Sequence, residues 1–172
     1  MLGKILKLFV GDKSKKDLKT ITPIIDQIHS FEDEIGKLSN DELRNQTSLF
    51  KEQIKSSISD VDEKIENLKI ELDKTKDFDK KESLFAEIDK LNEEAYKINE
   101  NTLNQILPKA FAVIKETAKR FVDNKEIVVT ANEYDLELST EKDYVNVTND
   151  KATWLNSWDA AGKKIVWDMV HY

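Results

Sequence analysis

Apolar residues recur at spacings of three and four through the first two thirds of the chain, which is the period of an amphipathic helix. A first such run extends from Leu18 to Ile35, and Gly36 follows it as a stop signal. Ser39 is a candidate N-cap for the next helix, because Glu42 stands three residues later and completes a capping-box pattern. The pattern therefore predicts two consecutive helices joined by a short turn.

From Ile54 onward the apolar positions form a stricter heptad seam. The first arm runs to Leu72, turn-like residues interrupt it at 75–79, and a second arm extends from Leu84 to Ile98. Charged and amide side chains fill most of the positions between the apolar ones. Two arms joined by a short break predict an antiparallel helical hairpin. A coiled-coil dimer formed through the same seam is the alternative structure.

The most apolar helical run lies between Leu107 and Val122. Its apolar residues share one wide helical face: Ala110, Phe111, Val113, Ile114, Ala118 and Phe121. Pro108 suits the first turn of a helix, where its missing N–H has no intrahelical partner to lose. We therefore expect a buried core helix with Pro108 in its first turn.

Beyond Val122 the apolar period changes to two, as in strands. The β-like runs are Ile127–Ala131, Tyr134–Leu138, Tyr144–Val147, Thr153–Leu155 and Lys164–Trp167. They predict a small, mostly antiparallel sheet packed on the helices, with Trp154, Trp158 and Trp167 in the contact between them. A ligand cage or stacking platform made of the three tryptophans is the alternative. The expected fold class is α+β, mainly α: N-terminal helices, a long antiparallel helical hairpin and a core helix, followed by this sheet.

Composition narrows the possible functions. The 172 residues carry a net charge of −7 and no cysteine, which argues against general nucleic-acid binding and removes disulfides and thiolate metal sites. Two histidines, His29 and His171, are too few and too far apart in sequence to suggest a metal site. No apolar run is long enough to cross a bilayer.

The N-terminus is basic although the whole chain is acidic. Residues 2–20 contain six lysines and two aspartates, and the first of them form a short amphipathic segment. A helix of this kind can lie on an anionic membrane surface, with its lysines among the headgroups. The candidate membrane or channel contacts are Leu2, Lys4, Ile5, Leu6, Lys7, Leu8 and Phe9. Docking of this segment on the protein itself or on a partner is the alternative.

Catalytic patterns are missing from the sequence. The four glycines stand alone, so no phosphate-binding loop is visible, and no Ser-His-Asp or lysine-centred nucleophile arrangement stands out. We therefore name no catalytic residue and no metal ligand. Taken alone, the residues indicate a helical interaction module, and a free-standing helical-hairpin adaptor acting by protein–protein contacts is one hypothesis for its function.

Four segments resemble a known family, and they occur in the family's order. Leu107–Arg120, LPKAFAVIKETAKR, resembles the "LPxAFAxVxEAxxR" run of the bacterial SecA family, and Ile28–Phe50 is similar to the family's "KLSDEELK" region. Met1–Gly11 is similar to the short Leu/Lys amphipathic start of the family. Asp168–Tyr172 resembles the family's "MRHFDVQ" run, cut just before its Asp-Val-Gln.

The resemblance implies the N-terminal part of an ATP-driven motor that moves preproteins through the SecYEG channel. ATP and Mg²⁺ would serve the parent protein, whereas this chain would hold no cofactor and hydrolyse no ATP, because the family's phosphate-binding loop would follow Tyr172. Met169 and Tyr172 match family positions beside the adenine pocket. The implied partners are the SecYEG channel, preproteins, acidic phospholipids and a second copy, at the cytoplasmic face of the cell membrane.

Two stretches depart from the family pattern and suggest a lineage with insertions, such as the Bacteroidetes. The expected segments are therefore N-terminal helices at 1–53, an inserted helical hairpin at 54–101, a core helix at the edge of the nucleotide-binding domain at 102–123, an inserted β-rich subdomain at 124–168, and the start of a truncated nucleotide-binding domain at 169–172.

Overall fold

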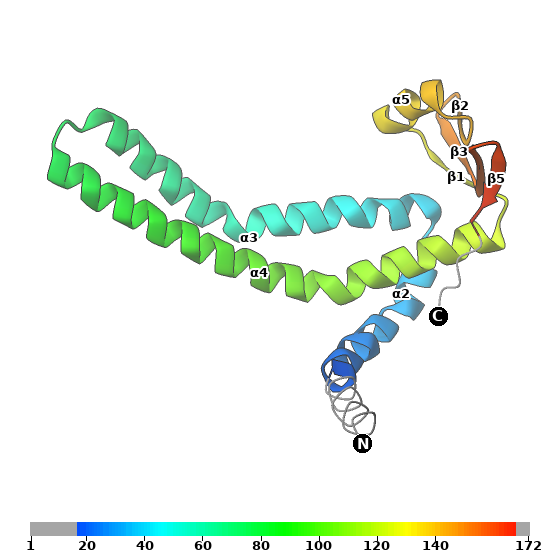
Figure 1. Cartoon of the computed structure of the whole chain (residues 1–172), viewed down its shortest axis with the longest axis horizontal. Helices are drawn as coiled ribbons and strands as arrows, with labels where there is room; N and C mark the ends of the chain where they lie inside the picture. The colour runs from blue at the N-terminus through cyan, green and yellow to red at the C-terminus, as the bar shows by residue number, and fades with distance from the viewer. Residues whose placement is uncertain (1–16, 168–172) are drawn as a thin grey trace, which may run out of the picture. The chain divides into compact units, whose positions relative to one another are not determined.

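A computed structural model describes residues 17–167 of the chain. The helices are residues 17–30, α2 (Glu32–Gly36), α3 (Asn40–Lys74), α4 (Phe78–Asp123) and α5 (Glu133–Glu141). The strands are β1 (Glu126–Thr130), β2 (Val145–Thr148), β3 (Lys151–Leu155), β4 (Ser157–Ala160) and β5 (Lys163–Val166). Helices followed by small antiparallel sheets confirm the predicted α+β, mainly α class (Figure 1).

The described chain forms two compact units. Residues 46–107 make up the first, which we call the hairpin unit, and residues 17–45 with 108–167 make up the second, which we call the sheet unit. Two of the segment boundaries expected from the sequence, after residues 53 and 101, fall inside α3 and α4, which continue there without a break. The division into five segments stays a prediction.

The hairpin unit contains the predicted seam. Val61 and Ile65 of α3 pack with Ile88 of α4, and the heptad residues around them complete the core: Leu68, Leu72, Leu91, Ala95 and Ile98. The break at residues 75–77 lets the chain reverse between α3 and α4 (Figure 1), and Lys80 forms an ion pair with Glu71 at 2.6 Å. The apolar seam is thus buried within one chain, so these residues offer no exposed apolar surface for dimerisation.

The sheet unit is built around a three-stranded antiparallel sheet of order β1-β3-β2. Ala152, on the central strand, is fully buried and lies opposite both Val129 and Val147. Ile127 completes this small core. β4 and β5 form a separate two-stranded hairpin. Its turn residues Ala161 and Gly162 both have positive φ, as a type I′ turn requires.

The helix predicted from Leu107 to Val122 is the last part of α4 rather than a separate element. Pro108 lies deep inside α4, so its expected place in a first turn is wrong. Proline lacks the N–H of the helical ladder, at a cost of about 3 kcal/mol, and burial of the Pro108 ring helps to offset it. The predicted apolar face is only partly buried: Val113 and Ala118 are covered, but Phe111 and Ile114 are exposed.

The strand predicted at Tyr134–Leu138 is also wrong, because these residues belong to helix α5. The alternation of Tyr134, Leu136 and Leu138 imitated a strand. A capping box stabilises the start of the helix instead. The Asn132 side chain accepts a hydrogen bond from the Asp135 N–H, and the Asp135 carboxylate accepts one from the Asn132 N–H. Strand β4, which contains Trp158, was not among the predicted runs.

The start of α3 confirms the predicted capping box. The Glu42 N–H donates to Ser39 Oγ at 3.2 Å, and the Ser39 N–H donates to Glu42 Oε2 at 2.7 Å. These bonds satisfy backbone donors that a helix N-terminus leaves without intrahelical partners. They also lower the pKa of the Glu42 carboxyl, the backbone bond from Ser39 being the main cause. No helix between residues 17 and 167 is long and apolar enough to span a bilayer.

Candidate functional site

The first turn of α3 lies against β1, which is an edge strand of the three-stranded sheet. Asp41 accepts hydrogen bonds from the Thr130 N–H at 2.6 Å and the Thr130 hydroxyl at 2.8 Å. Asn40 donates its side-chain amide to the Val128 carbonyl at 3.2 Å. These bonds cover an edge that would otherwise present unpaired backbone groups, and they fix the helix to the strand.

The centre of this junction is the ion pair between Arg44 and Asp135. Arg44 donates from Nη1 to Asp135 Oδ2 at 2.7 Å and from Nη2 to Oδ1 at 2.8 Å, a bidentate geometry. Asp135 is completely buried and also accepts bonds from the Asn132 N–H and from Trp154 Nε1. A buried carboxylate is tolerated only when a counter-charge and hydrogen bonds satisfy its oxygens in this way. We call Arg44, Asp135 and Trp154 the carboxylate junction.

The pKa of Asp135 is set by two opposed effects. Burial raises it, whereas the hydrogen bonds from Arg44, Asn132 and Trp154 and the Arg44 charge lower it by more, so the net shift is downward. The pKa of Asp41 is lowered as well, chiefly by the Thr130 N–H and hydroxyl. Both carboxyls are therefore charged at neutral pH and bind their partners as anions.

A second cluster surrounds Arg120 near the end of α4. Its guanidinium donates to Glu116 Oε1 at 2.8 Å, to Asn40 Oδ1 at 2.8 Å and to the Leu38 carbonyl at 2.7 Å. Arg120 thus holds the turn between α2 and α3 in place. Glu116 and Arg120 occupy the Glu and Arg positions of the "LPxAFAxVxEAxxR" resemblance. Arg120, held by Glu116, joins that segment to the Leu38–Asn40 turn of the other matched segment.

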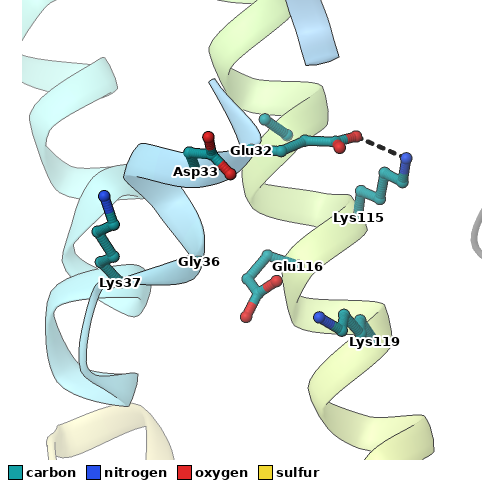
Figure 2. A pocket seen from close by; sticks show the side chains of 8 residues that line it. Glu32, Asp33, Gly36, Lys37, Lys115, Glu116 and Lys119 are labelled. Atoms are coloured by element: carbon teal, nitrogen blue, oxygen red, sulfur yellow. Dashed lines mark hydrogen bonds and ion pairs between the residues drawn. The ribbon is translucent and has the colours of Figure 1, made fainter. Parts of the chain in front are cut away.

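A groove of about 380 Å³ lies beside this cluster, between α2 and α4 (Figure 2). Lys115 reaches across to Glu32 at 2.6 Å, and this bond is the main cause of the lowered pKa of Glu32. The groove is lined by three lysines and three carboxylates. Because the charges balance, this groove favours neither an anionic nor a cationic ligand.

The three tryptophans line one cavity of about 310 Å³ in the sheet unit. Its walls are Phe121, Tyr144, Trp154, Leu155, Asn156, Trp158 and Trp167. Trp167 packs on Phe121 with ring centroids 5.8 Å apart, and its indole nitrogen is buried without a hydrogen-bond partner in the described part of the chain. Trp167 thus packs on α4 as expected, and Trp154 and Trp158 line the same cavity as Phe121. The ligand-cage alternative stays a prediction.

The residues nominated from the sequence lie outside the described chain. Leu2, Lys4, Ile5, Leu6, Lys7, Leu8 and Phe9, together with Met169 and Tyr172, precede residue 17 or follow residue 167. Within residues 17–167 no group of three His, Asp or Glu side chains could hold a metal ion. Sequence reasoning missed Arg44 and Asp135. The Asn132-x-x-Asp135 capping pattern was a signal for Asp135, but nothing in the sequence marked Arg44 as its partner.

The sequence model of the SecA DEAD-like domain matches residues 6–139. The chain belongs to the SecA family. It is 56% identical over 171 residues to the protein translocase subunit SecA of Flavobacterium psychrophilum and 46% identical over 167 residues to that of Phocaeicola vulgatus. The Porphyromonas gingivalis subunit is 42% identical over 166 residues. No solved structure matches the chain.

Each of these alignments covers at least 96% of the chain but 15% of the relative. The chain thus corresponds to the N-terminal region of a Bacteroidetes-type SecA, as the resemblance predicted. Since the alignments run over nearly the whole chain, these relatives share the hairpin and the β-rich part. The comparisons give no support to a free-standing adaptor.

The carboxylate junction predicts a large effect of removing one partner. Arg44→Met leaves Asp135 buried without its counter-charge, which costs about 3–5 kcal/mol. Lys115→Met is the matched control, because its ion pair with Glu32 is partly exposed and contributes about 0–1 kcal/mol. Urea unfolding followed by tryptophan fluorescence measures both. Equal losses in the two variants would contradict this account of the junction.

The lowered pKa values also predict acid sensitivity. Asp135 and Asp41 have folded pKa values below those of the unfolded chain, which are about 4. Their stabilisation is therefore complete above that pH and is lost as pH falls through the folded values. We expect the unfolding free energy to be flat near neutral pH and to fall below about pH 4. Asp41→Asn should reduce this acid-side slope, and an unchanged slope would contradict the assignment.

Proposed function

We propose that this chain is the N-terminal part of a SecA-type motor, which couples ATP hydrolysis to the translocation of preproteins through the SecYEG channel. The observation that carries the proposal is the alignment with protein translocase subunits over 99% of the chain at 56% identity. The likeness extends over 15% of that relative's length, so the activity belongs to a longer protein.

The contribution of the chain itself is structural. Arg120 binds the two segments that resemble the family motif to one another, and the carboxylate junction binds the start of α3 to the sheet. Such a brace would give a nucleotide-binding domain a fixed edge. The glycines of the described chain, Gly36 and Gly162, are isolated in sequence, so the described residues offer ATP no phosphate-binding loop. ATP and Mg²⁺ would be held by other parts of the motor.

The remaining partners follow from the same proposal. Residues 2–9 would contact acidic phospholipids and the channel at the inner face of the cell membrane, as their alternation of leucine and lysine suits an anionic surface. Met169 and Tyr172 would lie beside the nucleotide. Self-association would use surfaces other than the heptad seam, which α3 and α4 already cover.

A chimera tests the proposal. The region of Flavobacterium psychrophilum SecA that aligns with this chain over 171 residues is replaced by this chain. ATP hydrolysis is then measured with SecYEG proteoliposomes, with and without a preprotein. We expect preprotein-stimulated hydrolysis within about threefold of the unmodified protein, a difference below about 1 kcal/mol. The isolated chain should hydrolyse no ATP. A folded chimera without stimulated hydrolysis would contradict the proposal.

A further inference from the structure

The aromatic cavity of the sheet unit has no part in the proposed function. Its volume is about 310 Å³, and five of its seven wall residues are aromatic: Phe121, Tyr144, Trp154, Leu155, Asn156, Trp158 and Trp167. We call it the tryptophan cavity, because all three tryptophans of the chain line it. Ligand pockets have volumes of about 300–1,000 Å³, so this cavity suits a small molecule of one or two rings.

Contacts within the sheet unit hold the walls of the tryptophan cavity in place. Trp154 donates its indole N–H to a buried carboxylate at 3.1 Å, and its ring centroid lies 6.4 Å from that of Tyr144. The ring centroids of Phe121 and Trp167 are 5.8 Å apart. Asn156 donates its side-chain amide to the Phe121 carbonyl at 3.3 Å. The aromatic walls are therefore ordered before a ligand binds, which lowers the entropic cost of binding.

The walls of the tryptophan cavity carry no charged side chain. A charged ligand would lose its hydration there without meeting a counter-charge, which is unfavourable. The charged residues in the adjoining pocket or next to a wall residue in sequence are exposed, so water and salt screen them: Lys125, Glu126, Asp143, Asp159 and Lys164. Arg120, which precedes Phe121, is in an ion pair with Glu116. The walls therefore favour a neutral ligand.

One polar group of the walls still lacks a partner. The indole nitrogen of Trp167 is buried and has no hydrogen-bond partner among residues 17–167. Leaving a buried N–H unpaired is costly, and an acceptor atom on a ligand would remove that cost. A quaternary ammonium ion binds to aromatic faces but has no acceptor, so it would leave the N–H unpaired. The same is true of a purely hydrocarbon ligand.

We propose that the tryptophan cavity binds a small, neutral aromatic molecule that carries a hydrogen-bond acceptor. The ligand rings pack on the aromatic walls in stacked or edge-to-face geometry, and the acceptor binds the indole N–H of Trp167. A ring nitrogen or a ring carbonyl oxygen provides this acceptor. The inference is independent of the proposed function, because every wall residue belongs to the sheet unit and none is needed for the family assignment.

Quinoline, naphthalene and N-methylquinolinium test the proposal on the full chain, because the three molecules share the same fused rings. At mildly alkaline pH quinoline is a neutral acceptor, naphthalene has no acceptor, and N-methylquinolinium is a cation. We expect quinoline to bind about threefold to tenfold more tightly than naphthalene, the range that one hydrogen bond gives. N-methylquinolinium should bind most weakly.

Proton–nitrogen NMR spectra locate the bound probe, since the chain has only three indole N–H groups. Trp158→Phe and Trp167→Phe assign their own signals, and the remaining signal belongs to Trp154. Quinoline should shift the Trp167 N–H signal downfield, as a new hydrogen bond does, whereas naphthalene should not.

Matched variants separate the hydrogen bond from the aromatic wall. Trp167→Phe keeps a ring but removes the donor, so it should abolish the preference for quinoline over naphthalene. Tyr134→Phe removes a polar atom from an exposed ring outside the cavity and should leave the preference unchanged. Trp158→Ala removes a large part of the wall and should weaken both probes at least about tenfold. Circular dichroism verifies that each variant keeps its fold.

Any of four results would overturn the proposal. The first is the absence of saturable quinoline binding, and the second is equal affinity for quinoline and naphthalene. The third is tighter binding of N-methylquinolinium than of quinoline, which would indicate a cation cage. The fourth is tighter quinoline binding by a Met169→Ser, Val170→Ser variant, which would assign the cavity to the residues after Trp167; we expect no change. The assay uses neither ATP nor a preprotein, so its failure leaves the proposed function standing.

Discussion

The bidentate ion pair between Arg44 and Asp135 is the constraint on which the sheet unit depends. Asp135 is fully buried and would be costly as an unpaired anion. Four hydrogen bonds satisfy it, from Arg44, Asn132 and Trp154. One carboxylate therefore caps α5, receives the indole of β3 and accepts the arginine of α3. Because Arg44 lies 91 residues and Trp154 19 residues from Asp135 in sequence, the pair specifies how helix and sheet meet, in addition to any net stabilisation.

The hairpin unit is stabilised in a different way. Its core consists of aliphatic residues at heptad spacing, contributed by α3 and α4 on either side of the reversal at residues 75–77. Hydrophobic burial of this kind is non-directional and depends little on pH. The two units thus respond differently to acid and to substitution. A long α4 paired with one helix can bury only one of its faces, and Phe78, Phe85 and Tyr96 are accordingly exposed.

Sequence patterns predicted the elements with strong local signals and missed those set by tertiary contacts. The heptad seam, the Ser39–Glu42 capping box and most strands follow from spacing and turn chemistry. Alternation at Tyr134, Leu136 and Leu138 pointed to a strand, but the capping box at Asn132 produced a helix. Pro108 suggested a helix start, but it lies inside α4, where its ring is buried. Arg44 could not be identified, because a partner 91 residues away leaves no local pattern.

For a member of the SecA family, this arrangement means that the N-terminal region contains a sheet unit held by directional polar contacts and a hairpin unit with an apolar core. We conclude that the carboxylate junction stabilises the sheet unit and not the hairpin unit. Native-state hydrogen exchange of Arg44→Met tests it most directly. The account predicts that backbone amides of Val129 and Ala152 lose protection, while those of Val61, Ile65 and Ile88 keep theirs. Loss of protection in both units, or unchanged protection at Ala152, would contradict it.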